Sequence, residues 1–173
     1  MAHAVKAIAL LATLALAACN NPDRYGAGGP GGAGGAGGIG AGGIGSASDP
    51  NSPAYFNQTV GDRVFFAVDQ STISGEAAPI LAAQAQWLNS HPEYTVIIEG
   101  HADEQGTREY NVSLSGKRAN AARDYLISQG VSSNRIIRTV PWGKEKPVAV
   151  CPQESCFAQN RRAVTVLQMG AGM

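Results

Sequence analysis

The chain has 173 residues and a formal net charge of zero, with 13 Lys and Arg against 13 Asp and Glu. This length allows one ordinary domain with additional segments. Basic residues do not form a stripe interleaved with aromatic residues, which argues against a nucleic acid partner.

The first 18 residues predict an export signal. Lys6 supplies a positive charge before the apolar run 8–18, which is shorter than the roughly 20 residues of a membrane-spanning helix. The run closes with Leu16-Ala17-Ala18-Cys19, which resembles the lipobox of bacterial lipoproteins. The resemblance implies that Cys19 becomes the N-terminus and carries acyl chains, palmitate among them, which together give stable anchoring. The next residue is Asn20, which by the sorting rule of enterobacterial lipoproteins implies the outer membrane.

Residues 19–54 predict a tether between the lipid anchor and a domain. Glycine makes up 13 of the 20 residues from Gly26 to Gly45, and such a segment buries too little surface to offset its ordering entropy. As a Gly-rich coil, the 36 residues after Cys19 span about 30–36 Å on average. Fully extended they reach about 120 Å, which lifts a domain clear of the membrane.

Residues 55–173 predict one domain of the α/β (α+β) sandwich class. β-branched and apolar runs alternate with helical spacing, so we expect the order β-α-β-α-β-β, with one mixed sheet and the helices on one face. The short last connection favours at least one antiparallel pair. The expected strands are 63–68, 94–99, 134–142 and 162–168, and the expected helices are 74–90 and 107–129.

Cys151 and Cys156 are the remaining pair of cysteines once Cys19 is acylated. Export to an oxidising compartment favours a disulfide between them. A metal site is the alternative, but it needs further ligands nearby in the sequence, and we expect no metal and no cofactor.

The segment 100–120 is polar and charged, and it joins an expected strand to an expected helix. Asp103 follows the strand, while Asn111, Leu114 and Arg118 share one side of the helix through i, i+3, i+7 spacing. One carboxylate, one guanidinium, one amide and one apolar contact suit a zwitterion, such as the free end of an amino acid. The alternative is that Asp103 and Arg118 pair with each other.

A set of motifs then points to a family. The motifs are Gly100-His101-Ala102-Asp103, Gly106, Tyr110-Asn111, Leu114-Ser115, Arg118-Ala119 and Asn160-Arg161-Arg162. Over residues 64–167 they resemble the OmpA C-terminal-like family of peptidoglycan-binding domains. The resemblance implies that Asp103 receives the ammonium and Arg118 the carboxylate of a free diaminopimelate end in peptidoglycan stems, with Phe66, Asn111 and Leu114 around them.

The same resemblance, with the lipobox and tether, implies an outer-membrane lipoprotein with its domain in the periplasm. It also implies roles in envelope integrity and cell division, and partners among the Tol proteins, TolB included. A scaffolding lipoprotein that acts mainly through periplasmic protein partners is the alternative. The family often has Phe-Asp-x-Asp near the first strand, whereas this chain has Phe66-Ala67-Val68-Asp69 and so lacks the first acid.

A catalytic function is not expected, because the sequence offers no spaced set of metal ligands and no nucleophile beside a histidine. His101 fits a packing or hydrogen-bonding role better than direct contact with a ligand. One of Arg161 and Arg162 is expected to support the site, and the sequence does not distinguish them.

Overall fold

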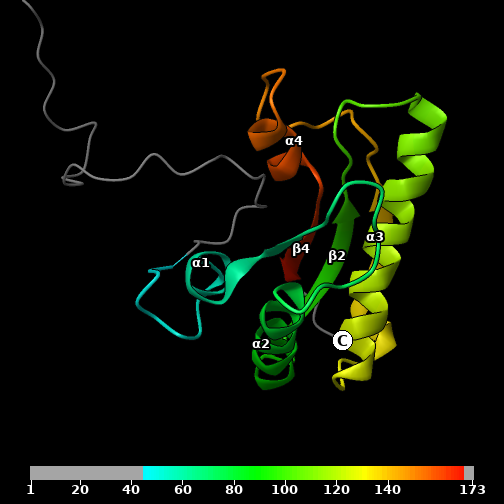
Figure 1. Ribbon diagram of the computed structural model, residues 1–173. Coiled ribbons are helices and arrows are strands. Elements are labelled where there is room, and N and C mark those ends of the chain that lie inside the picture. The colour runs from blue at the N-terminus through cyan, green and yellow to red at the C-terminus, as the bar shows by residue number, and fades with distance from the viewer. Residues whose placement is uncertain (1–44, 170–173) are drawn as a thin grey trace, which may run out of the picture. The chain divides into compact units, whose positions relative to one another are not determined.

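The computed structural model describes residues 45–169, which form four strands, two long helices and four shorter helical segments (Figure 1). The predicted signal, Cys19 and most of the predicted tether lie outside these residues. The elements, in chain order, are α1 (Pro53–Tyr55), the π-helix η2 (Phe56–Gly61), β1 (Arg63–Phe65), α2 (Ala77–Ser90), β2 (Tyr94–Gly100), α3 (Arg108–Ser128), the 3-10 helix η3 (Ser133–Arg135), β3 (Ile136–Pro141), α4 (Glu154–Asn160) and β4 (Arg162–Met169).

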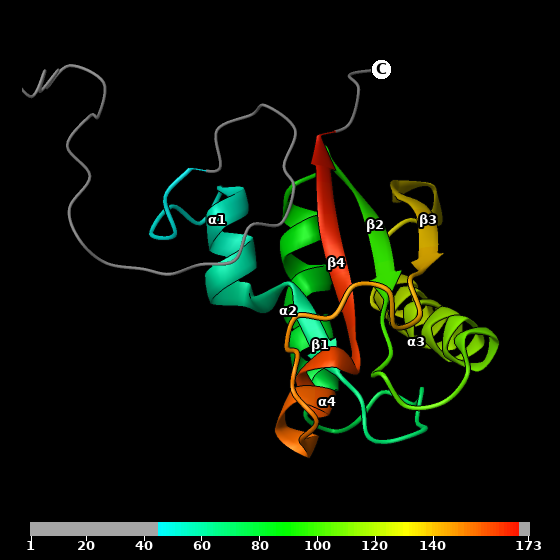
Figure 2. The ribbon, with the colours of Figure 1, turned by 90° about the horizontal axis from the view of Figure 1, so that it is seen from above.

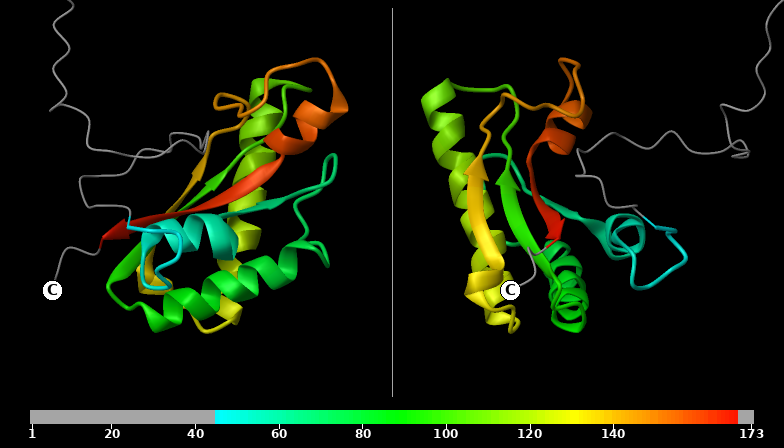
Figure 3. Two further views of the ribbon diagram at one scale, coloured as in Figure 1. Left: turned by 90° about the vertical axis from the view of Figure 1, so that its left-hand side faces the viewer. Right: turned by 180° about the vertical axis from the view of Figure 1, so that it is seen from behind.

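The strands form one mixed sheet in the order β1-β4-β2-β3. β4 runs antiparallel to both β1 and β2, whereas β2 and β3 are parallel, as Figure 3 shows from behind the molecule. The predicted fold class, with a mixed sheet and at least one antiparallel pair, is confirmed. Because β1, β2 and β3 all run in one direction, the loops that follow them meet at one edge of the sheet, where β4 begins.

The first strand is shorter than predicted. β1 ends at Phe65, although the backbone N–H of Phe66 still donates to the carbonyl of Arg161 (2.9 Å). The chain then turns, with Gln70 N–H donating to the Ala67 carbonyl (3.1 Å) and Asp69 at a φ of 56°. The expectation of a strand to residue 68 is therefore wrong, because a turn begins directly after Phe66.

The two long helices pack on one face of the sheet (Figures 2 and 3). Alternate residues of β2 are buried, which is the pattern of a strand with one covered face. The shared core of sheet and helices contains Val64, Leu81, Leu88, Val96, Ile98, Ala119, Ala122 and Leu126.

The second long helix, α3, carries one side of the candidate site and is fixed at both ends. The hydroxyl of Thr107 accepts from the backbone N–H of Tyr110 (3.2 Å), which caps the first turn. Gly130 follows the last turn at a φ of 92°, a conformation that favours glycine. Near its middle the helix lies so close to β2 that a Cβ on Gly100 would stand 1.9 Å from the carbonyl oxygen of Ser115.

The chain already contacts the domain before the predicted tether boundary at residue 54. The indole N–H of Trp87 donates to the Pro50 carbonyl (2.8 Å), and the Trp87 ring stacks on His91 at a centroid distance of 4.0 Å. Within residues 45–169, no helix combines the length and the apolar character needed to cross a membrane.

Candidate functional site

The candidate site lies at the sheet edge where the loops after β1, β2 and β3 meet. Hydrogen bonds tie these loops together: Ala102 N–H donates to the Gly143 carbonyl (2.8 Å), and Trp142 N–H donates to the Gly100 carbonyl (2.9 Å). The N-terminal half of α3 closes one side. The topology therefore brings together the segments that carry Phe66, Asp103 and Arg118.

Asp103 is buried, at 8% exposure, and each of its carboxylate oxygens has one partner. Oδ2 accepts from Arg161 Nη1 (3.1 Å), and Oδ1 accepts from the backbone N–H of Gln105 (3.2 Å). A carboxylate offers about four acceptor positions, so Asp103 keeps capacity for a further donor. Its ion-pair partner among the described residues is Arg161 and not Arg118.

Arg118 is fully buried and bonds to backbone carbonyls instead of to an acid. Its Nε donates to Gln70 (2.8 Å), Nη1 to His101 (2.9 Å) and Nη2 to Ala67 (3.2 Å). The Phe66 ring lies against the guanidinium, with its centroid 5.3 Å from Cζ. Burial lowers the pKa of Arg118 to about 10, and the nearby Asp103 opposes this effect. The side chain is therefore still a cation at neutral pH.

The other predicted site residues on α3 surround this pair. Asn111 is buried and its Nδ2 donates to the Gln105 carbonyl (2.7 Å), so it holds the loop that carries Asp103. Leu114 is buried on the same side of the helix. The Ser115 hydroxyl donates to the Val112 carbonyl and accepts from Gly143 N–H (both 2.9 Å), which joins α3 to the loop after β3.

The segment that lacks the expected acid contributes in another way. At Ala67 the backbone carbonyl takes a hydrogen bond from Arg118, and two residues later Asp69 accepts from the Tyr110 hydroxyl (3.0 Å). Asp69 also favours the charged form of Arg118 and so counteracts part of the burial effect on its pKa. The loop 67–70 thus covers Arg118 and is fastened to α3.

The two consecutive arginines have different roles. Arg161 contacts Asp103, whereas Arg162 donates to the carbonyls of Lys146 (3.2 Å) and Asn160 (3.4 Å) at the start of β4. Asn160 was not singled out from sequence, yet its Nδ2 donates to Glu104 (2.6 Å). The motif Asn160-Arg161-Arg162 contained this signal, but the local sequence does not show which residue faces the site.

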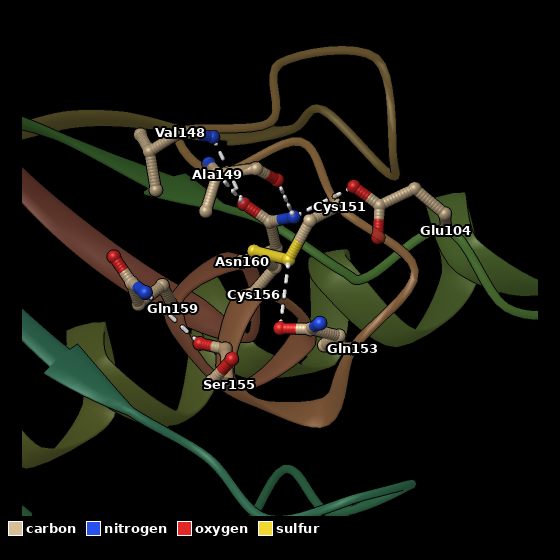
Figure 4. The surroundings of a disulfide bond; sticks show 9 residues. All are labelled: Glu104, Val148, Ala149, Cys151, Gln153, Ser155, Cys156, Gln159 and Asn160. Atoms are coloured by element: carbon tan, nitrogen blue, oxygen red, sulfur yellow. Dashed lines mark hydrogen bonds between the residues drawn. A yellow bond between two sulfur atoms is a disulfide. The ribbon is translucent and has the colours of Figure 1, made fainter.

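Cys151 and Cys156 are joined by a disulfide just before and within α4 (Figure 4). Within the described part of the chain, no group of three or more His, Cys, Asp and Glu side chains is arranged to hold a metal ion. A cavity of about 280 Å³ lies beside the site and is lined by Phe65, Phe66, Ala158 and Gln159. A larger hollow of about 410 Å³ lies by Trp87 and His91, on elements that carry none of the predicted site residues.

Comparison with known proteins places these features in a family. Residues 65–161 match the OmpA family. The peptidoglycan-associated lipoprotein of Rhizobium meliloti (strain 1021) is 53% identical over 170 residues, which cover 95% of this chain and 88% of that protein. That of Brucella melitensis biotype 1 is 49% identical over 173 residues, covering 96% and 92%.

Solved structures agree with this assignment. The crystal structure of the peptidoglycan-associated lipoprotein from Burkholderia pseudomallei has a TM-score of 0.62 and 41% identity, and the match covers 70% of this chain and 98% of that one. The C-terminal domain of Helicobacter pylori MotB, 19% identical with a TM-score of 0.58 over 64% of this chain and 86% of that chain, shares the fold.

The OmpA family is not a family of enzymes, so the prediction of a non-catalytic protein is confirmed. The relatives from Rhizobium meliloti and Brucella melitensis are about half identical to this chain over nearly its whole length. The chain belongs to the OmpA family and is similar to the peptidoglycan-associated lipoproteins within it.

Proposed function

We propose that this protein binds peptidoglycan non-covalently and links the outer membrane to the cell wall. Asp103 receives the ammonium and Arg118 the carboxylate of a free diaminopimelate end in an uncross-linked peptide stem. Phe66, Asn111 and Leu114 complete the site. The names of the relatives and the family of the domain support this proposal.

The observation that carries the proposal is that two buried opposite charges lie near each other without forming a pair. Asp103 is paired with Arg161, and Arg118 is bonded to three carbonyls. Buried charges usually neutralise one another directly. Charges held apart by other partners suit a ligand that carries both signs itself.

Binding of the ligand carboxylate requires the loop 67–70 to move away from Arg118. A guanidinium has five N–H donors, and three of those of Arg118 already reach carbonyls. Arg118 is 0% exposed, so a ligand carboxylate reaches the remaining donors only when this loop moves away. The bonds to Ala67 and Gln70 and the contact between Asp69 and Tyr110 are the ones that would open or rearrange.

The membrane side of the proposal rests on Cys19 and the predicted tether. Acyl chains on Cys19 anchor the protein in the outer membrane, and the tether places the domain in the periplasm. We propose a role in the Tol–Pal system, with TolB and other Tol proteins as partners, in envelope integrity and cell division.

Sedimentation with purified sacculi tests the binding site. We expect the full-length chain in mild detergent to sediment with sacculi, and Asp103→Asn and Arg118→Ala to lose binding. Loss of one partner of a buried charge-assisted contact costs about 2–5 kcal/mol, which is more than ten-fold in affinity.

Arg135→Ala is the matched control. Arg135 also donates to backbone carbonyls, those of Leu88, His91 and Tyr94, but none of these partners belongs to the site. This variant should lose stability in urea and keep sacculus binding. Wild-type binding by both Asp103→Asn and Arg118→Ala would refute the assignment, and release of soluble muropeptides would refute a purely binding function.

A further inference from the structure

Arg161 connects three segments of the candidate site through three different nitrogen atoms. Its Nε donates to the Phe66 carbonyl (3.2 Å), its Nη1 donates to Asp103 (3.1 Å), and its Nη2 donates to Glu154. These partners lie just after β1, in the loop after β2 and at the start of α4. The side chain is 5% exposed, so it is buried inside the site.

Asn160, the preceding residue, connects the same region in a parallel way (Figure 4). Its Nδ2 donates to Glu104 (2.6 Å) and to the Ala149 carbonyl (2.8 Å), while its Oδ1 accepts from the backbone N–H of Val148 (2.8 Å). Asp103 and Glu104 are neighbours in the loop after β2. Both therefore depend on side chains at the end of α4.

The disulfide fixes the beginning of α4. This helix has only seven residues and no side-chain hydrogen bond at its N-cap, Gln153. Such a short helix is marginal without outside support. The disulfide between Cys151 and Cys156 closes a covalent ring of backbone that includes Glu154, and it thereby holds the Glu154 carboxylate near Arg161.

The charges of this group also suit the ligand. Asp103, Glu154 and Arg161 together carry one negative charge, whereas Asp103 and Arg161 alone would be neutral. Burial disfavours the charge on Arg161, but its hydrogen bonds to Glu154 and Asp103 outweigh this and raise its pKa. A group that keeps a net negative charge attracts an ammonium, while a neutral pair does so poorly.

We propose that Arg161 is the positioning residue of the site and that the disulfide-bonded turn 151–156 holds it in place through Glu154. This inference rests on the proposed function, because it explains how Asp103 is oriented toward the ligand. Arg161 does not touch the ligand. It acts by fixing the Asp103 carboxylate and the backbone of Phe66 in one arrangement.

Titration calorimetry with an uncross-linked muropeptide tests the proposal on the full-length chain in detergent. We expect Glu154→Ala and the double variant Cys151→Ser/Cys156→Ser each to weaken binding by about ten-fold. This is the lower end of the loss of affinity at metal sites when a residue that orients a ligand side chain is removed. Arg161→Lys keeps the charge but cannot reach three partners at once, so it should also bind weakly.

Asp124→Ala is the matched control for Glu154→Ala. Asp124 is paired with Arg123 on α3 and its side chain is 63% exposed, against 64% for Glu154. Removing Asp124 takes away an equally exposed, arginine-paired acid that contacts no site residue. We expect its binding to match that of the wild type.

Side-chain NMR separates positioning from a general loss of structure. The Arg161 Nε–H signal should be slow to exchange in the wild type and should broaden or exchange faster in Glu154→Ala and in the cysteine variant. The Trp87 indole N–H, bonded to Pro50, should stay unchanged and so report an intact fold.

The possible failures are distinct. If the wild type does not bind the muropeptide, the proposed function fails. If the wild type binds and Glu154→Ala, Arg161→Lys and the cysteine variant bind equally well, the positioning role is overturned. Glu154 is on the surface, so Glu154→Ala decides the question even if the cysteine variant fails to fold.

Discussion

Two buried arginines next to Asp103 use their donors in different ways. Arg118 gives its identified hydrogen bonds to backbone carbonyls and lies against Phe66, whereas Arg161 divides its donors between one carbonyl and two acids. An arginine bonded to carbonyls keeps its full charge available to an anion. An arginine shared by two carboxylates does not, which supports the proposal that Arg118 receives the ligand carboxylate.

His101 should make the stability of the domain depend on pH. It is 2% exposed, its Nε2 lies 3.6 Å from Glu99 Oε2, and neither ring nitrogen has a partner at hydrogen-bond distance among residues 45–169. Burial lowers the pKa of His101 below its ordinary 6.5; Glu99 partly opposes this, and the charges of Arg162 and Lys146 add to it. The unfolded chain then takes up this proton more readily than the folded one. The stability that depends on a neutral His101 is therefore fully present above pH 6.5 and is lost as the pH falls through the lowered pKa.

Urea unfolding between about pH 7.5 and pH 5.5 measures this effect. One proton taken up on unfolding changes the free energy of unfolding by about 1.4 kcal/mol per pH unit. The stability of His101→Leu should depend less on pH, because this variant lacks the titrating group. Glu99, whose pKa is lowered through its contact with His101, makes stability depend on pH only below its ordinary pKa of 4.5. Equal pH dependence in the two proteins would contradict the role of His101.

At the residue scale, the sequence predicted the kinds of side chain better than their partners. The i, i+3, i+7 spacing brought Asn111, Leu114 and Arg118 to one side of α3, as the structure has it. The partner of Asp103 was not predictable, because Arg161 is 58 residues away and its position depends on β4 lying next to β1 and β2. Local patterns carry no information about that strand order.

The contact between α3 and β2 should tolerate no side chain at Gly100. A Cβ there would stand 1.9 Å from the backbone oxygen of Ser115 and 3.1 Å from the Ala119 side chain. Backbone cannot move aside as a flexible side chain can, so the helix must shift. We expect Gly100→Ala to lower the free energy of unfolding by about 3 kcal/mol, the upper part of the usual range for overpacking, and to weaken sacculus binding.

Gly116→Ala, on α3, is the matched control, and its effect on stability should have the opposite sign. A Cβ at Gly116 would meet only Pro141 at 3.6 Å, an ordinary contact. Alanine is better than glycine in a helix by about 0.5–1 kcal/mol, so this variant should be slightly more stable. The urea midpoints of the two variants measure both effects, and a Gly100→Ala variant as stable as wild type would show that the helix is not held against β2 there.

At the element scale, the long periodic segments were predictable and the short ones were not. α3 was expected over 107–129 and spans Arg108–Ser128, because its pattern repeats over several turns and Thr107 and Gly130 mark its ends. No helix was expected between the strands 134–142 and 162–168, where α4 lies. Its seven residues are too few to show a period, and a disulfide and the contacts of Asn160 and Arg161 support it from outside.

For the whole molecule, the charge balance and the predicted tether lead to one further expectation. The domain from residue 55 has 11 basic and 11 acidic side chains, so we expect the proposed binding to the cell wall to depend on the site and not on net charge. If the protein links membrane and wall as proposed, the predicted tether determines how easily one molecule engages both, since a link raises the effective concentration only when it can span the two sites.

Deletion of residues 26–45 should separate binding from bridging. It leaves only the six residues 20–25 between Cys19 and the segment from residue 46, whose Pro50 already contacts Trp87. Six residues reach about 20–22 Å when extended, against about 86–94 Å for the 26 residues 20–45. The shortened protein should bind purified sacculi as well as the wild type does, because the domain is unchanged. In cells that carry the shortened protein, outer membrane should separate from sacculi during fractionation, and a periplasmic marker enzyme should leak out.

Replacing residues 26–45 with a Gly-Ser segment of equal length should restore both properties, because the reach of such a coil depends on its length. Failure of this replacement would mean that the Gly-rich segment acts through its own sequence and not as a spacer.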